Sequence, residues 1–119
     1  MIVSREVGDV VILDLPEHIR RGDEEGPTLV QCVTAELDMQ KRKFIFNFEN
    51  VRSVDDVGIG EILASYVSIR NFGGRLKFAC LSSKLCIMFK VGMISPPWLA
   101  GPGETPPFET VEAALRSFD

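Results

Sequence analysis

The sequence is poor in the residues that build metal centres and catalytic sites. Its 119 residues include one histidine and three cysteines, and the cysteines form no Cys-x-x-Cys pair. A zinc site needs several such ligands at close spacing, and no such set is visible. A phosphate-binding glycine loop and a nucleophile beside a base are also missing. We therefore expect no metal, no cofactor and no catalysis, with Cys32, Cys80 and Cys86 as reduced thiols among apolar neighbours.

Positive charge is scarce as well. Thirteen lysines and arginines stand against seventeen aspartates and glutamates, which gives a formal net charge of -4 and a pI near 5.0. A global positive field that would attract nucleic acid or an anionic membrane is therefore absent. Apolar runs such as residues 10–13 are too short to cross a bilayer, and residues 1–5 lack the pattern of a signal peptide. We expect a cytoplasmic protein that binds no nucleic acid and does not insert into membranes.

What is present is the composition of an ordinary globular domain. Hydrophobic residues make up 45% of the chain and charged residues 25%, far from the polar composition of disordered chains. No repeat, charge block or linker divides the sequence. A chain of this length can bury its own core without disulfides. We expect a single domain over residues 1–119.

Hydrophobic periodicity and turn residues predict alternating strands and helices. The turn pair Gly8-Asp9 lies between the opening segment 2–7 and the apolar run 10–15, and it predicts an N-terminal β-hairpin. Residues 16–24 are expected to form a polar loop. Strands are predicted over residues 2–7, 10–15, 44–48 and 75–81, with a brief edge strand near 105–108. Helices connect these strands, so crossovers should produce an α/β fold with a mixed, mostly parallel sheet in which residues 44–48 are central.

The predicted helices are recognised by apolar stripes and by their end signals. The first should begin with Pro27 at its first position, the second should end at Gly73-Gly74, the third should begin at Ser82 or Ser83, and the last should close the chain. The side chains expected to face the core are Leu29, Val30, Val33, Leu37, Ile59, Ile62, Leu63, Tyr66, Ile69, Leu85, Met88, Phe89, Val111, Ala114, Leu115 and Phe118.

The most specific pattern lies where the second predicted helix starts. It reads Asp55-Asp56-Val57-Gly58-Ile59-Gly60. This segment resembles the STAS family, named for sulfate transporters and anti-sigma-factor antagonists, which has Asp-Ser-Ser-Gly-Leu-Gly at a helix start. The likeness continues through residues 61–66, 69–76 and 112–118, and the element order matches along almost the entire chain. The resemblance implies the STAS-like fold, with four to five strands and about four helices, and a protein-protein interaction module.

Asp56 stands where the family has its phosphoacceptor serine, and Val57 replaces the second serine. In the family, a kinase that is also the anti-sigma factor phosphorylates the first serine and thereby abolishes the complex. An aspartate has no hydroxyl to phosphorylate. Its single charge partly imitates the charge of about -1.5 to -2 on a phosphoserine, and helix N-terminal N–H groups can stabilise either anion. The resemblance therefore implies a site that is either phosphomimetic or independent of phosphorylation. The partner it implies is an anti-sigma factor serine kinase or another protein of this pathway.

The predicted partner-binding residues are Asp55, Asp56, Val57, Gly58, Asp23 and Ser82. The two adjacent aspartates allow two compatible interpretations, because Asp55 can cap the helix while Asp56 faces solvent. Ser53 is the nearest hydroxyl that could accept a phosphoryl group, although most serines at strand ends are unmodified. Trp98 lies in a loop rich in proline and glycine, where it can anchor a partner or fold back over the sheet edge.

Three alternatives remain open at the level of the sequence. The acidic loop that contains Glu17, His18 and Asp23 could be taken for a metal site, but its spacing fits a solvated loop better. The chain could be a structural STAS subunit of a signalling scaffold or of a lipid-transport ATPase complex. It could also form a homodimer.

Overall fold

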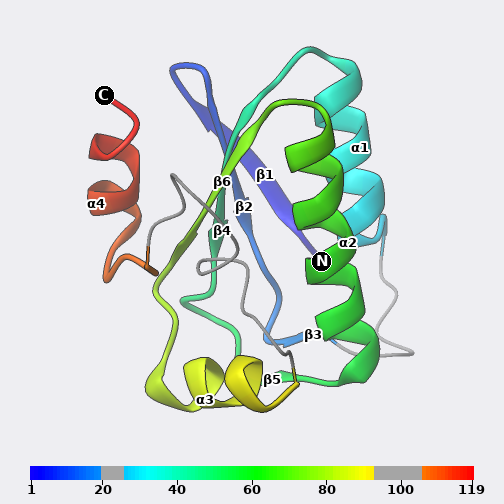
Figure 1. Cartoon of the computed structure of the whole chain (residues 1–119), viewed down its shortest axis with the longest axis vertical. Helices are drawn as coiled ribbons and strands as arrows, with labels where there is room; N and C mark the ends of the chain where they lie inside the picture. Colours follow the sequence, from blue (N-terminus) through cyan, green and yellow to red (C-terminus); the bar gives the residue numbers. More distant parts are fainter. Residues whose placement is uncertain (20–25, 93–105) are drawn as a thin grey trace.

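The computed structural model describes residues 1–19, 26–92 and 106–119, and Figure 1 shows the path of the chain. The predictions for Asp23 and for the Trp98 loop lie outside the described residues. The elements are β1 (Val3–Val7), β2 (Val10–Asp14), β3 (His18–Ile19), α1 (Leu29–Asp38), β4 (Lys43–Asn47), β5 (Ser53–Val54), α2 (Asp56–Asn71), β6 (Arg75–Ala79), α3 (Ser83–Gly92) and α4 (Val111–Arg116).

The main sheet has four strands in the order β1-β2-β4-β6. β1 and β2 form the predicted antiparallel hairpin, while the pairs β2/β4 and β4/β6 are parallel. The mixed, mostly parallel α/β sheet and the central position of residues 44–48 are therefore confirmed. β3 and β5 form a second, two-stranded parallel sheet, and β3 lies within residues 16–24, which were predicted to be a loop. That prediction was wrong for His18 and Ile19, because two residues are too short to show a period.

Helices cover both faces of the main sheet, with α1 and α2 on one face and α4 on the other (Figure 1). The side chains of β4 pack against the helices on both faces of the sheet. Phe44 and Phe46 belong to the larger cluster with α1 and α2, whereas Ile45 belongs to the smaller cluster with Val111 of α4. Alternate residues of a strand point to opposite faces, so a strand buried on both sides is apolar without interruption.

Two helix predictions need correction. Thr28, not Pro27, opens α1: its Oγ1 accepts from the Gln31 N–H at 3.2 Å, and Gln31 Oε1 accepts from the Thr28 N–H at 2.9 Å. This capping box places Pro27 before the helix. Leu63 was expected in the core but is 40% exposed. The buried place is taken by Ser65, whose hydroxyl donates to the Glu61 carbonyl at 2.8 Å and is thereby satisfied.

The later elements agree with the sequence except at their ends. Gly73 has φ of 79° and follows the Phe72 cap, which confirms the predicted end of α2. β6 ends at Ala79 and not at residue 81, because Cys80 has φ of 62° and leaves the strand. The edge strand expected near 105–108 is, among the described residues, a single bridge between Phe108 and Ala79.

Candidate functional site

The start of α2 is fixed by Asp55. Its Oδ1 accepts from the Gly58 N–H at 2.9 Å, and its carbonyl accepts from the Ile59 N–H at 2.9 Å. An N-cap of this kind satisfies one of the backbone donors that a helix leaves unpaired at its beginning. The prediction that Asp55 caps this helix is confirmed.

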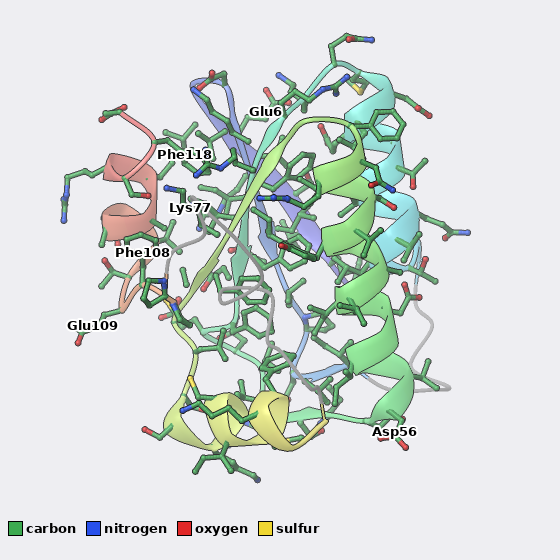
Figure 2. The ribbon with its side chains drawn as sticks, in the orientation of Figure 1. Glu6, Asp56, Lys77, Phe108, Glu109 and Phe118 are labelled. Carbon is green, nitrogen blue, oxygen red and sulfur yellow. The ribbon has the colours of Figure 1, made fainter. Side chains whose placement is uncertain are left out.

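Asp56 is the first residue of α2, and its side chain is exposed. Figure 2 shows the carboxylate pointing away from the ribbon at the lower end of the helix. An acid in the first turn is stabilised by the positive end of the helix dipole. Val57 follows it and is 39% exposed. The surface at this helix start therefore presents a carboxylate beside a small apolar side chain.

Gly58 supports this surface from beneath. A Cβ at this position would overlap the Ile19 carbonyl oxygen and would lie 2.7 Å from Val54 Cγ1. The Asp55 N–H donates to the same Ile19 carbonyl at 3.1 Å. β3 therefore holds the first turn of α2 in place, and Gly58 is required because the two backbones approach so closely. Gly58 was predicted to be a partner-binding residue. The structure gives it this packing role, and contact with a partner stays a prediction.

A second polar group lies next to the helix start. His18 Nδ1 is 2.6 Å from Ser53 Oγ, and its Nε2 is 3.7 Å from Glu17 Oε1. Glu17 also pairs with Arg52 at 3.1 Å. The contact between His18 and Ser53 was not predicted, since residues 35 positions apart meet only when β3 pairs with β5. Ser53 is half-buried, and its phosphorylation stays a prediction.

A small hollow of about 80 Å³ lies beside the helix start, with Ile2, His18, Leu29, Val57 and Glu61 in its wall. Among the polar groups of this wall, Glu61 is already engaged, because its Oε2 accepts from the Val30 N–H at 3.2 Å. Pockets for cofactors or drug-sized ligands usually measure about 300 to 1,000 Å³. This hollow is therefore too small for such a ligand.

Ser82 lies immediately before α3, away from the start of α2. Its Oγ accepts from the Leu85 N–H at 3.1 Å, which confirms it as the cap of α3. In the view of Figure 2, the beginning of α3 and the labelled Asp56 lie at opposite sides of the lower end of the molecule. The structure thus brings Asp55, Asp56, Val57 and Gly58 together but separates them from Ser82. A role of Ser82 in partner binding stays a prediction.

The three cysteines are half-buried and form no disulfide. Burial raises the pKa of the Cys32 and Cys80 thiols, and the negative charge of nearby acids such as Glu49 raises the pKa of Cys80 further. Both shifts favour the protonated thiol over the nucleophilic thiolate. No group of three or more histidine, cysteine, aspartate or glutamate residues in residues 1–19, 26–92 and 106–119 is placed to hold a metal. Within the same ranges, none of the helices combines the length and the apolar character needed to cross a bilayer.

Comparison with known proteins identifies the fold. No family model matches the sequence, and no curated protein matches it either. Solved structures do match. The NMR structure of the protein TM1081 has a TM-score of 0.76 and 19% identity, over 98% of this chain and 86% of that one. The crystal structure of tm1081 from Thermotoga maritima has a TM-score of 0.66 and 17% identity, over 98% of this chain and 92% of that one.

The unphosphorylated form of the anti-sigma factor antagonist SpoIIAA matches over 99% of this chain and 97% of its own, with a TM-score of 0.66 and 17% identity. The chain is therefore an α/β domain with the STAS fold. More particularly, it has the fold of the anti-sigma factor antagonists, as the resemblance of its sequence implied. Identities this low establish the fold and leave the function to be argued from the site.

Proposed function

We propose that the chain is a non-enzymatic interaction module of the anti-sigma factor antagonist type. It binds an anti-sigma factor serine kinase, or another regulatory protein of the same pathway, through the start of α2. The observation that carries this proposal is the exposed carboxylate of Asp56 at the first residue of that helix, in a fold shared with SpoIIAA. In this role the chain acts in the cytoplasm and regulates transcription by occupying the anti-sigma factor.

Recognition rests on a charge that no phosphatase can remove. Asp55 and the contact of Gly58 with Ile19 hold the first turn rigidly, so that Asp56 and Val57 are presented without reorganisation. A groove that carries arginine or lysine attracts this carboxylate, whereas an acidic groove repels it. The interaction uses no metal and no cofactor, and it does not depend on phosphorylation of Asp56.

Binding measurements on position 56 test the proposal. Calorimetry with the serine-kinase anti-sigma factors of the same organism would compare the wild-type chain with the Asp56→Asn, Asp56→Ser and Asp56→Ala variants. A charge-assisted contact at an interface contributes about 1 to 2 kcal/mol, so neutral variants should bind roughly five- to thirtyfold more weakly. Asp38→Asn is the matched control, because it removes the same charge from the exposed end of α1 and should leave affinity unchanged.

Equal affinity of the wild-type chain and all three variants would show that Asp56 does not govern recognition. Tighter binding by Asp56→Ser would overturn the proposal that the charge of Asp56 promotes binding. The carboxylate would then hold the module in its non-binding form, as a phosphate does in the family.

A further inference from the structure

The outward side of α2 carries a stripe of exposed residues. We call it the α2 stripe, and it consists of Asp56, Gly60, Leu63, Val67 and Arg70. Successive members are four, three, four and three residues apart, which places them on one side of a helix. The buried residues of α2 occupy the opposite side. Leu63 is 40% exposed and Val67 is 46% exposed, so the middle of the stripe is an apolar surface open to solvent.

Charge is confined to the two ends of the α2 stripe. Asp56 begins the helix and Arg70 lies in its last turn, about 21 Å away at 1.5 Å per residue. The charged residue between them, Glu61, is half-buried and accepts from the Val30 N–H of α1. The stripe therefore has an acidic end, an apolar middle and a basic end.

Gly60 is a second feature of the α2 stripe that indicates contact with another molecule. A Cβ at this position would meet nothing within 4 Å. The packing of the domain therefore does not need a glycine here, in contrast to Gly58, although a glycine inside a helix is less favourable than an alanine. A bare backbone at an exposed helix position allows another helix to approach closely.

The α2 stripe is its own complement. A rotation of 180° about an axis through Leu63 places Asp56 opposite Arg70 of a second copy and Gly60 opposite its Val67. Leu63 then meets Leu63 of the second copy on the axis. Such an arrangement is the isologous contact of a twofold dimer, in which each surface supplies both halves of every pair. Opposite charges meet at both ends, and a small residue faces a larger one between them.

We propose that two copies of the chain form a homodimer in which their α2 stripes pack antiparallel. The occupant of this exposed face is a second copy because charge and side-chain size match under the twofold rotation. One pair of helices buries less surface than the roughly 1,200 Å² at the lower end of stable interfaces. The dimer should therefore be reversible, with a dissociation constant between about 1 µM and 1 mM.

Dimerisation would also regulate the site. Asp56 belongs both to the α2 stripe and to the proposed partner surface, so the dimer hides the carboxylate that the partner binds. This consequence rests on the proposed function, whereas the dimer itself does not. Self-association would supply the control that a permanent charge cannot obtain from phosphorylation.

Sedimentation of the chain alone tests the dimer, over concentrations from about 1 µM to 1 mM. Asp56→Arg and Arg70→Asp should each weaken the dimer at least about tenfold, because each places like charges opposite one another at both ends. The double variant D56R/R70D restores the pairing and should return to within about threefold of wild type. Asp38→Arg makes the same charge change away from the stripe and should have no effect. Leu63→Glu should abolish the dimer.

Circular dichroism would establish that each variant is folded. A wild-type chain that stays monomeric over this range overturns the proposal. A dimer that Leu63→Glu leaves intact, or that the double variant fails to restore, overturns the assignment to the α2 stripe. No partner takes part in these measurements, so their failure leaves the test of the proposed function untouched.

Discussion

Gly58 and Gly60 stand two residues apart in α2 and differ in what surrounds them. Gly58 is buried against the Ile19 carbonyl, which leaves no room for a side chain. Gly60 faces open space. The sequence pattern Gly-x-Gly could not distinguish them, because the difference depends on β3, whose two residues show no period. One glycine serves the fold, and the other leaves a helix surface bare.

Alanine substitution at the two glycines should therefore give opposite results. Gly58→Ala forces β3 away from α2 and should lower the free energy of unfolding by about 1 to 3 kcal/mol. Gly60→Ala adds a helix-favouring residue without a clash and should leave stability unchanged or raise it by up to about 1 kcal/mol. Urea denaturation of both variants measures the difference. Equal destabilisation by the two substitutions would contradict these distinct roles.

Contacts between residues close in the chain could be predicted from the sequence, whereas contacts between distant residues could not. The cap formed by Asp55 was predictable because donor and acceptor lie three residues apart in the chain. The exposure of Asp56 followed from the same helix start. The contact between His18 and Ser53 could not be predicted, since it depends on the register of β3 and β5.

At the scale of elements, α4 shows how a short helix is held in place. Its six residues are too few to form a stable helix alone, so tertiary contacts must supply its stability. Lys77 of β6 provides one group of contacts on that face of the sheet (Figure 2). Its Nζ is 4.4 Å from the centroid of the Phe118 ring and donates to Ser117 Oγ at 2.7 Å. The Phe108 ring lies 5.6 Å from the same nitrogen.

Replacement of Phe118 separates the aromatic contact from simple burial. Phe118→Leu keeps an apolar side chain but removes the ring face, so the free energy of unfolding should fall by about 0.5 to 2 kcal/mol. Phe118→Ala also loses apolar burial and should cost more. Urea denaturation gives these values, and hydrogen exchange should show the loss first in residues 106–119. Protection of α4 in Phe118→Leu equal to that in the wild-type chain would argue against the lysine contact.

Prediction of the elements succeeded where an apolar pattern extends over many residues and failed where the element has only two residues. β4, α2 and β6 were predicted because apolar residues repeat over several positions, whereas the hairpin was predicted from its turn pair Gly8-Asp9. The start of α1 was misplaced because Pro27 and Thr28 are both typical of a helix start, and the side chain of Gln31 decides between them. Leu63 was assigned to the core because a helical period alone does not say how wide the buried side is.

At the scale of the whole molecule, the partner complex and the proposed dimer compete for Asp56. If only the monomer binds the partner, the apparent affinity falls with the fraction of chain that is monomeric. At a total concentration about ten times the dimer dissociation constant, about one fifth of the chain is monomeric by mass action. Partner binding should then be about fivefold weaker than in dilute solution.

Arg70→Asp distinguishes competition from a direct effect on the partner site. Arg70 lies about 21 Å along α2 from Asp56, so its replacement breaks the dimer without touching the helix start. In concentrated solution this variant should bind the partner about fivefold more tightly than the wild-type chain, and in dilute solution the two should be equal. Asp56→Arg should lose both interactions. Equal binding of wild type and Arg70→Asp at high concentration would mean that the dimer leaves Asp56 accessible, and regulation by self-association would be excluded.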